Sequence, residues 1–179
     1  MNAQIKPANY RELLLGAGTR QDKRITWPEV PSNWTNLTTL DIMPSNKPDV
    51  IHDLDVLPYP FADNEFDEIH AYEILEHCGR QGDWRFFFAQ FSEFYRILKP
   101  GGYFAGSCPM WDQVWAFSDP GHTRIISSAS LMFLSQKFYM DQVGKTAATD
   151  YRDVYKADFE TLSCKEQGVQ YYFVLQANK

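Results

Sequence analysis

Residues 12–19 read Glu-Leu-Leu-Leu-Gly-Ala-Gly-Thr, a short apolar run followed at once by two glycines. An apolar run of this length that ends in turn residues is typical of a buried strand leading into a loop. Gly16 and Gly18 let the backbone of such a loop approach a ligand closely, because glycine has no Cβ atom. The segment therefore predicts a strand whose carboxyl end carries a binding loop.

The same pattern of short apolar runs recurs along the chain. After the first strand, we expect strands at residues 38–40, 49–52, 66–71, 103–108, 157–165 and 169–177. The last two flank a short turn that contains glycine, which favours a hairpin.

The strongest helical signal covers residues 83–98. Asp83 can cap the free N–H groups, and apolar side chains then recur at intervals of three and four residues. Lys99-Pro100-Gly101-Gly102 should end this helix, because proline cannot continue the hydrogen-bond ladder. A helical turn is expected at residues 72–77 and a further helix at residues 130–143.

Alternation of strands and helices without a linker or repeat indicates one domain over residues 1–179. The expected architecture is a doubly wound α/β sheet of seven strands, mostly parallel, with an antiparallel C-terminal hairpin. Residues 109–150 follow the fifth strand and are expected to form a lid insertion on the substrate side.

Candidate ligand-binding residues gather at the carboxyl ends of the first three strands, where this architecture binds its ligands. Gly16 and Gly18 follow the first strand, Asp41 the second and Asp53 the third. A carboxylate at Asp41 can accept hydrogen bonds from two vicinal ribose hydroxyls. Two alternatives stay open: ordinary turn glycines, and an Asp53 that caps a helix or turn.

The residue at position 21 separates two kinds of adenosine cofactor. A G-x-G-x-x-G fingerprint for a dinucleotide pyrophosphate requires glycine there, but the chain has Gln21. S-adenosylmethionine has ribose and adenine but no phosphate, so its binding does not require a glycine at position 21. The sequence therefore favours S-adenosylmethionine over a dinucleotide.

Taken together, these residues resemble the small type 11 group of class I S-adenosylmethionine-dependent methyltransferases, which have a Rossmann-like fold. The matching segments, in order, are residues 12–19, Asp41, residues 53–69, Ile74-Leu75-Glu76-His77 and residues 96–102. The resemblance implies six cofactor-binding residues, which are Gly16, Gly18, Asp41, Asp53, Leu54 and Ala71. It places Asp53 at the adenine amino group, the Leu54 amide at the adenine ring, and Ala71 near the methionine amino group.

The chain departs from that family pattern between its first two strands. Trp27-Pro28 and Val30-Pro31 interrupt the usual long helix, so we expect a short helical turn plus a loop. Arg20 or Lys23 would then supply positive charge to the cofactor carboxylate, or both are solvated surface cations. Few residues precede the first strand, so the substrate side is either open or completed by another subunit, in a homo-oligomer or with a partner.

His122, in the segment 119–124, is the candidate catalytic residue. A histidine on the loop after the fifth strand can act as a base for a nucleophile that must lose a proton. The alternative is a loop anchor that hydrogen-bonds Asp119 or the backbone. Glu76 and His77 are interpreted as structural groups. Trp111, Trp115 and Phe117 are expected to form a substrate wall or the core of a lid.

Composition excludes several classes of function. The net charge of −6 makes bulk nucleic acid an unfavourable partner. No uncharged run approaches the length of a membrane span, and residues 1–7 lack the pattern of a secretion signal. The three cysteines, Cys78, Cys108 and Cys164, have no metal-site spacing, so we expect no disulfide, no zinc site and a cytoplasmic location.

The leading hypothesis is a methyltransferase that uses S-adenosylmethionine to methylate a small molecule. The alternative is a non-catalytic cofactor-binding or regulatory subunit with the same fold. A nucleotide-dependent oxidoreductase is disfavoured by Gln21.

Overall fold

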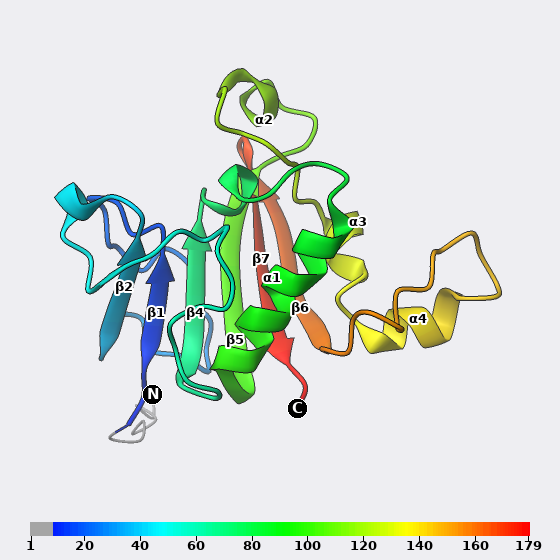
Figure 1. Ribbon diagram of the computed structural model, residues 1–179, viewed down its shortest axis with the longest axis horizontal. Helices are drawn as coiled ribbons and strands as arrows, with labels where there is room; N and C mark the ends of the chain where they lie inside the picture. Colours follow the sequence, from blue (N-terminus) through cyan, green and yellow to red (C-terminus); the bar gives the residue numbers. More distant parts are fainter. Residues whose placement is uncertain (1–8) are drawn as a thin grey trace.

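The computed structural model describes residues 9–179 and consists of one mixed sheet with helices against it (Figure 1). The strands run in the order β3-β2-β1-β4-β5-β7-β6. Their bounds are β1 Glu12–Leu15, β2 Leu37–Asp41, β3 Val50–Ile51, β4 Phe66–Tyr72, β5 Leu98–Pro109, β6 Phe159–Gln167 and β7 Gln170–Ala177. Residues 1–7, where the sequence shows no secretion signal, lie outside the described part.

Strand directions confirm the expected fold class. The pairs β3–β2, β2–β1, β1–β4 and β4–β5 are parallel, whereas β5–β7 and β7–β6 are antiparallel. The parallel strands point upward in Figure 1, so their carboxyl ends lie at the upper edge of the sheet. That edge is where an α/β sheet of this kind places its ligand.

Helix α1, Trp84–Ile97, covers one face of the sheet (Figure 1). The Asp83 side chain caps it by accepting a hydrogen bond of 3.0 Å from the Phe86 amide, as the sequence predicts. Phe88, Phe91 and Phe94 form its buried stripe. The next strand begins at Leu98 rather than at the expected residue 103, because Leu98 already pairs with Phe66 and an irregularity in the register absorbs the Pro-Gly-Gly segment.

The helix expected over residues 130–143 is wrong as one element. It is divided into α3, Ser128–Met132, and α4, Gln136–Gln142, because Ser127 and Ser135 each cap a separate N-terminus. The other short helices are α2, Trp115–Ser118, and the 3₁₀ helices η1, Pro44–Asn46, and η2, Leu75–His77. In Figure 1, α2 lies above the upper edge of the sheet, and α4 lies to the side beyond β6.

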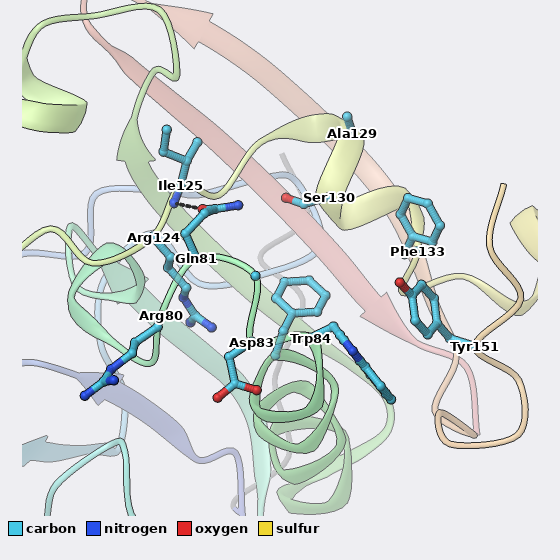
Figure 2. Close-up of a pocket in the computed structure, with 12 residues that line it drawn as sticks. Arg80, Gln81, Asp83, Trp84, Arg124, Ile125, Ala129, Ser130, Phe133 and Tyr151 are labelled. Carbon is cyan, nitrogen blue, oxygen red and sulfur yellow. Dashed lines mark hydrogen bonds between the residues drawn. The ribbon is translucent and has the colours of Figure 1, made fainter. Parts of the chain in front are cut away.

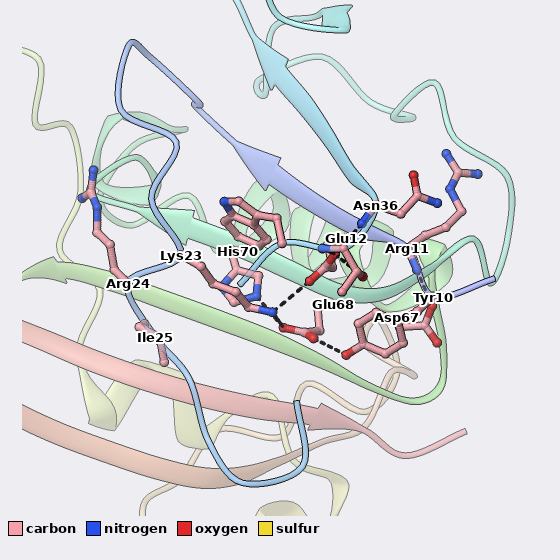
Figure 3. Close-up of polar contacts among 12 residues, drawn as sticks. Tyr10, Arg11, Glu12, Lys23, Arg24, Ile25, Asn36, Asp67, Glu68 and His70 are labelled. Atoms are coloured by element: carbon pink, nitrogen blue, oxygen red, sulfur yellow. Dashed lines mark hydrogen bonds and ion pairs between the residues drawn. The ribbon is translucent and has the colours of Figure 1, made fainter. Parts of the chain in front are cut away.

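The opposite face of the sheet is covered by the connection from β1 to β2. This connection contains turns and loop but not the expected helical turn. Lys23 extends from it into the protein, where its Nζ lies 2.9 Å from Glu12 Oε1 and 2.7 Å from Glu68 Oε2 (Figure 3). Both suggested roles for Lys23 are therefore wrong. Arg20 is an exposed cation that pairs with Asp22.

A chain of buried polar groups continues from Lys23 along β4. The second Glu68 oxygen accepts a hydrogen bond from the Tyr10 hydroxyl, and His70 lies between Glu68 and the Tyr72 hydroxyl, at 2.8 and 2.6 Å. Because side chains alternate along a strand, Glu68, His70 and Tyr72 share this face. The Tyr72 hydroxyl accepts hydrogen bonds from two backbone amides of the β1–β2 connection. Polar contacts thus fix the β1–β2 connection against the sheet.

The electrostatics of this buried network follow from its hydrogen bonds. Burial favours a higher pKa for Glu12 and Glu68, but hydrogen bonds to each carboxylate, including those from Lys23, hold the pKa below its usual value. Burial lowers the pKa of His70, and the neighbouring Glu68 offsets only part of this effect. Glu12 and Glu68 are therefore charged at neutral pH, and His70 is neutral.

Within residues 9–179, no helix combines the length and hydropathy that a membrane span requires.

Candidate cofactor site

The loop after β1 has a left-handed backbone at both glycines. Gly16 has φ +57° and Gly18 has φ +54°, values that residues with a Cβ atom rarely adopt. At Gly16 space is also limited, because an added Cβ would lie 2.5 Å from Cγ1 of Ile74. The Ile74 side chain therefore packs directly over Gly16.

Asp41, at the end of β2, holds this loop in place. Its buried carboxylate accepts hydrogen bonds of 2.7 Å from the amides of Gly18 and Met43, and one of 3.2 Å from the Asn46 side chain. A carboxylate offers about four acceptor positions, so about one remains for a ligand. The sequence predicts Asp41 as the acceptor for both ribose hydroxyls, and the structure adds a second role in fixing Gly18.

Asp53 and Leu54 follow β3. Asp53 is exposed, and its Oδ1 accepts a hydrogen bond of 2.9 Å from the Asp55 amide, which is the turn-capping arrangement left open above. The Leu54 carbonyl accepts a hydrogen bond from Tyr59, whereas its amide makes no hydrogen bond to the described part of the chain. That amide is therefore available to a ligand.

A cavity of about 200 Å³ lies between these loops and η2. It contains four of the six predicted cofactor residues, Gly16, Asp41, Asp53 and Leu54. Gly18 is not part of its lining but is bonded to Asp41. Ala71 is fully buried within the sheet between Leu15 and Gly106, away from the cavity lining. The remaining lining residues are Leu40, Ile42, His52, Asp55, Ile74, His77 and Cys78.

Ile74 and His77 extend from the connection after β4 into the wall of this cavity, and sequence reasoning did not assign either of them to it. The preceding residue, Glu73, has φ +54° and binds Ser107 on β5 through backbone and side-chain hydrogen bonds. This kink after a buried strand turns η2 toward the cavity. A left-handed glutamate has no clear sequence signal, which is why the placement was missed.

His122, the predicted base, does not line this cavity. Its ring packs edge-on against the ring of His77, with centroids 4.6 Å apart. Its Nε2 lies 3.9 Å from Asp119 Oδ2, which is too long for the anchoring hydrogen bond considered above. Backbone bonds hold the loop instead, because the amides of Thr123 and Arg124 donate to the Glu76 carbonyl at 2.9 and 3.2 Å.

The Glu76 side chain lies in the protein interior and does not cap a helix. It is only 2% exposed, and neither carboxylate oxygen has a hydrogen-bond partner among the described residues. Burial raises the pKa of Glu76 to about 8. Glu76, His77 and His122 each place a potential ligand atom within 4.8 Å of the others.

A second cavity, of about 330 Å³, lies between the start of α1 and α3 (Figure 2). Its aromatic residues are Trp84, Phe87, Phe133 and Tyr151, with Arg80 and Arg124 as the cations. Trp111, Trp115 and Phe117, the expected substrate wall, line neither cavity and are exposed. They lie on and beside α2, which extends away from the sheet (Figure 1).

Comparisons with known proteins agree with this architecture. Residues 25–106 match the methyltransferase domain family, and no curated protein sequence matches the chain significantly. An S-adenosylmethionine-dependent methyltransferase from Archaeoglobus fulgidus superposes with a TM-score of 0.58 and 14% identity, over 94% of this chain and 86% of that one. A chain of the Haloferax volcanii complex that contains the Trm112 methyltransferase activator gives 0.62 and 14%, over 96% and 83%. NodS, an N-methyltransferase from Bradyrhizobium japonicum WM9 in complex with S-adenosyl-L-homocysteine, gives 0.54 and 13%, over 95% and 79%.

The fold is therefore that of the S-adenosylmethionine-dependent methyltransferases. The family match over residues 25–106 is consistent with the small type 11 group of class I, and S-adenosylmethionine is the cofactor of this class. The matched segment begins after Gly16 and Gly18, so the family match does not cover the loop after β1. The expected contact of this loop with the cofactor therefore rests on the geometry of the two glycines.

Proposed function

We propose that this protein transfers a methyl group from S-adenosylmethionine to a small-molecule acceptor. The observation that carries the proposal is the cavity at the carboxyl ends of β1 and β2, which combines left-handed Gly16, the Asp41 carboxylate and the available Leu54 amide. These groups fit the methionine, ribose and adenine parts of the cofactor, respectively. The bound cofactor would supply an electrophilic methyl group.

The cavity also sets a condition on binding. At about 200 Å³ it is smaller than the roughly 300–1,000 Å³ of typical small-molecule sites. The Ile74 side chain occupies the space above Gly16, so the proposal requires this side chain to move when the cofactor binds.

The second cavity supports a small acceptor. Its lining begins at Arg80, two residues after Cys78 of the cofactor cavity, and α3 with Phe133 forms another wall (Figure 2). Its wall is mostly aromatic and aliphatic, which suits a partly apolar molecule. Within the proposed lid, residues 125–133 take part in this wall, whereas α4 lies beyond β6.

Two measurements test the proposal. Calorimetry should detect binding of S-adenosylhomocysteine, and incubation of the protein with S-adenosylmethionine and a dialysable cell extract should produce S-adenosylhomocysteine. Ala129→Trp, which fills the second cavity, should abolish turnover but leave S-adenosylhomocysteine binding unchanged. Equal loss of turnover in an exposed-site control, Met132→Trp, would show that the second cavity does not hold the acceptor.

A second candidate function, a subunit that acts only with a partner, is favoured by one observation. Trp111, Val114, Trp115 and Phe117 are each 59–67% exposed, and they lie close together in sequence on and beside α2. Clustered exposed aromatic residues are typical of interaction sites. The Haloferax volcanii complex shows that a protein of this fold occurs with an activator. Cofactor binding without turnover by the isolated chain would support this candidate, as would a sedimentation mass above that of a monomer.

A further inference from the structure

Three potential metal ligands converge beside the cofactor cavity. Glu76 and His77 lie on η2, and His122 comes from the loop after α2, far along the chain. The backbone bonds from Thr123 and Arg124 to the Glu76 carbonyl hold the two segments together. Main-chain geometry therefore brings the three side chains together, in addition to the edge-on ring contact between His77 and His122.

The burial of the Glu76 carboxylate is only weakly compensated, by its own backbone, the Cys108 thiol and the more distant charge of Arg124. Both oxygens lack a hydrogen-bond partner among the described residues, and Nδ1 of His122 is likewise buried and unpartnered. Burying a carboxylate without partners is costly, and an unsatisfied group of this kind in a native protein needs a physical explanation, of which a bound ion is one. One ligand atom each of Glu76, His77 and His122 lies within 4.8 Å of the others, a spacing that a bound cation can bridge.

The Arg124 guanidinium is an alternative counter-charge for the Glu76 carboxylate, but its hydrogen bonds go to other groups. Its Nε donates to the Leu75 carbonyl at 2.8 Å, and one terminal nitrogen donates to the Gln90 side chain. The other terminal nitrogen, Nη1, makes no hydrogen bond to Glu76. Arg124 therefore does not neutralise Glu76 through a direct ion pair.

We propose that Glu76, His77 and His122 bind a divalent transition-metal ion, with zinc as the expected occupant. Two imidazoles and one carboxylate form a donor set that suits zinc and leaves a coordination position open. The expectation of no metal rests on cysteine spacing and does not extend to ligands that come from distant segments. In this arrangement His122 is a metal ligand rather than a free base.

Part of this inference rests on the proposed function. His77 is exposed and lines the cofactor cavity, so the bound ion lies at the cavity wall with its open position accessible. A hydroxyl or amine of the acceptor can occupy that position. Coordination lowers the pKa of a bound hydroxyl, and its proton then passes to solvent.

Metal binding is tested without any acceptor. Protein freed of metal by dialysis against a chelator is titrated with Co²⁺, whose visible absorption reports coordination by imidazole, and then with Zn²⁺ as competitor. We expect one Co²⁺ per chain, displaced by Zn²⁺. His77→Asn, His122→Asn and Glu76→Gln should each weaken Co²⁺ binding by more than about 100-fold, beyond the effect of an outer-shell partner.

His52→Asn is the matched control, because His52 lines the same cavity but lies outside the cluster; it should bind Co²⁺ like the wild type. Absence of binding in a protein that still melts cooperatively would overturn the inference. So would Co²⁺ binding that survives both His122→Asn and Glu76→Gln. S-adenosylhomocysteine binding is measured on the same samples. If the protein binds S-adenosylhomocysteine but no metal, only the metal site is refuted. If it binds metal but no S-adenosylhomocysteine, only the proposed function is refuted.

Discussion

Lys23 lies with its ammonium nitrogen 2.9 Å from Glu12 and 2.7 Å from Glu68, and its side chain is only 2% exposed. This contact joins the β1–β2 connection to two strands at once. A buried cation between two carboxylates does not by itself prove a stabilising pair, but its removal leaves uncompensated buried charge.

Lys23→Met should therefore destabilise the protein by roughly 3–5 kcal/mol, the range for removing one partner of a buried ion pair. Urea denaturation followed by fluorescence measures the change. Arg20→Met is the matched control: Arg20 pairs with Asp22 in an exposed position, so its loss should cost less than about 1 kcal/mol. Similar effects of the two substitutions would contradict a buried role for Lys23.

The same network predicts a loss of stability in acid. His70 has a folded-state pKa below its usual value of 6.5, so the unfolded chain binds more protons as the pH falls through that value. Glu12 and Glu68 have lowered pKa values, so their contribution is present above their usual pKa of 4.5 and is lost as the pH falls through the folded-state values. The His70 and glutamate effects both lower the free energy of unfolding as the pH falls.

We expect the His70 contribution to the free energy of unfolding to decrease between about pH 7.5 and 5.5 by at most about 1.4 kcal/mol per pH unit. Glu76, whose pKa is raised to about 8, contributes in the opposite direction in this interval, so the His70 contribution is read as the difference between the wild type and a variant that lacks it. His70→Gln keeps hydrogen-bonding groups but does not titrate, so its curve should be flatter in this interval even if its overall stability is lower. Denaturation at several pH values provides the test. Parallel curves for the two proteins would show that His70 does not titrate differently on folding.

Asp41 is expected to serve both the cofactor and the loop. Asp41→Ala should weaken S-adenosylhomocysteine binding by about 1.5–3 kcal/mol, the range for hydrogen bonds to a charged group. It should also lower the melting temperature, because the Gly18 and Met43 amides lose their acceptor. Asp53→Ala should affect binding less, since that carboxylate is exposed and caps a turn. Calorimetry on both variants would refute the assignment if Asp53→Ala had the larger effect on affinity.

Sequence patterns predicted the sheet because its strands carry local signals. The leucines of β1 end in two glycines whose left-handed conformation the structure contains, and the Asp83 cap and phenylalanine stripe of α1 lie where the periodicity places them. In α3 and α4, by contrast, the apolar spacing continues across a break that two serine caps create. Periodicity does not detect such a break when the local capping signal is overlooked.

The site was only partly predictable, for a physical reason. Gly16, Asp41, Asp53 and Leu54 lie at strand ends, where chain order alone brings them together. Lys23 was misplaced because its two partners lie on separate strands, and no local feature distinguishes a buried lysine from a surface one. The convergence of His77 and His122 depends on long-range backbone bonds between their loops, which spacing in the sequence does not encode.

A substitution at Ile74 tests whether the cofactor cavity opens when the cofactor binds. Its side chain lies so close over Gly16 that an added Cβ there would be within 2.5–2.9 Å of three Ile74 atoms. A ligand that reaches Gly16 must displace this side chain and lose its packing. Ile74→Ala should therefore tighten S-adenosylhomocysteine binding, and a gain of about 1 kcal/mol corresponds to roughly fivefold in affinity.

The same substitution should lower the stability of the unliganded protein by about 1–2 kcal/mol, less than for a fully buried isoleucine, since Ile74 is only partly buried. Leu162→Ala, on β6 far from the cavity, is the control for unspecific effects and should leave affinity unchanged. Calorimetric titration of the three proteins provides the measurement. Weaker binding by Ile74→Ala would mean that the cofactor packs against Ile74 in place, and that the cavity enlarges through movement of another wall.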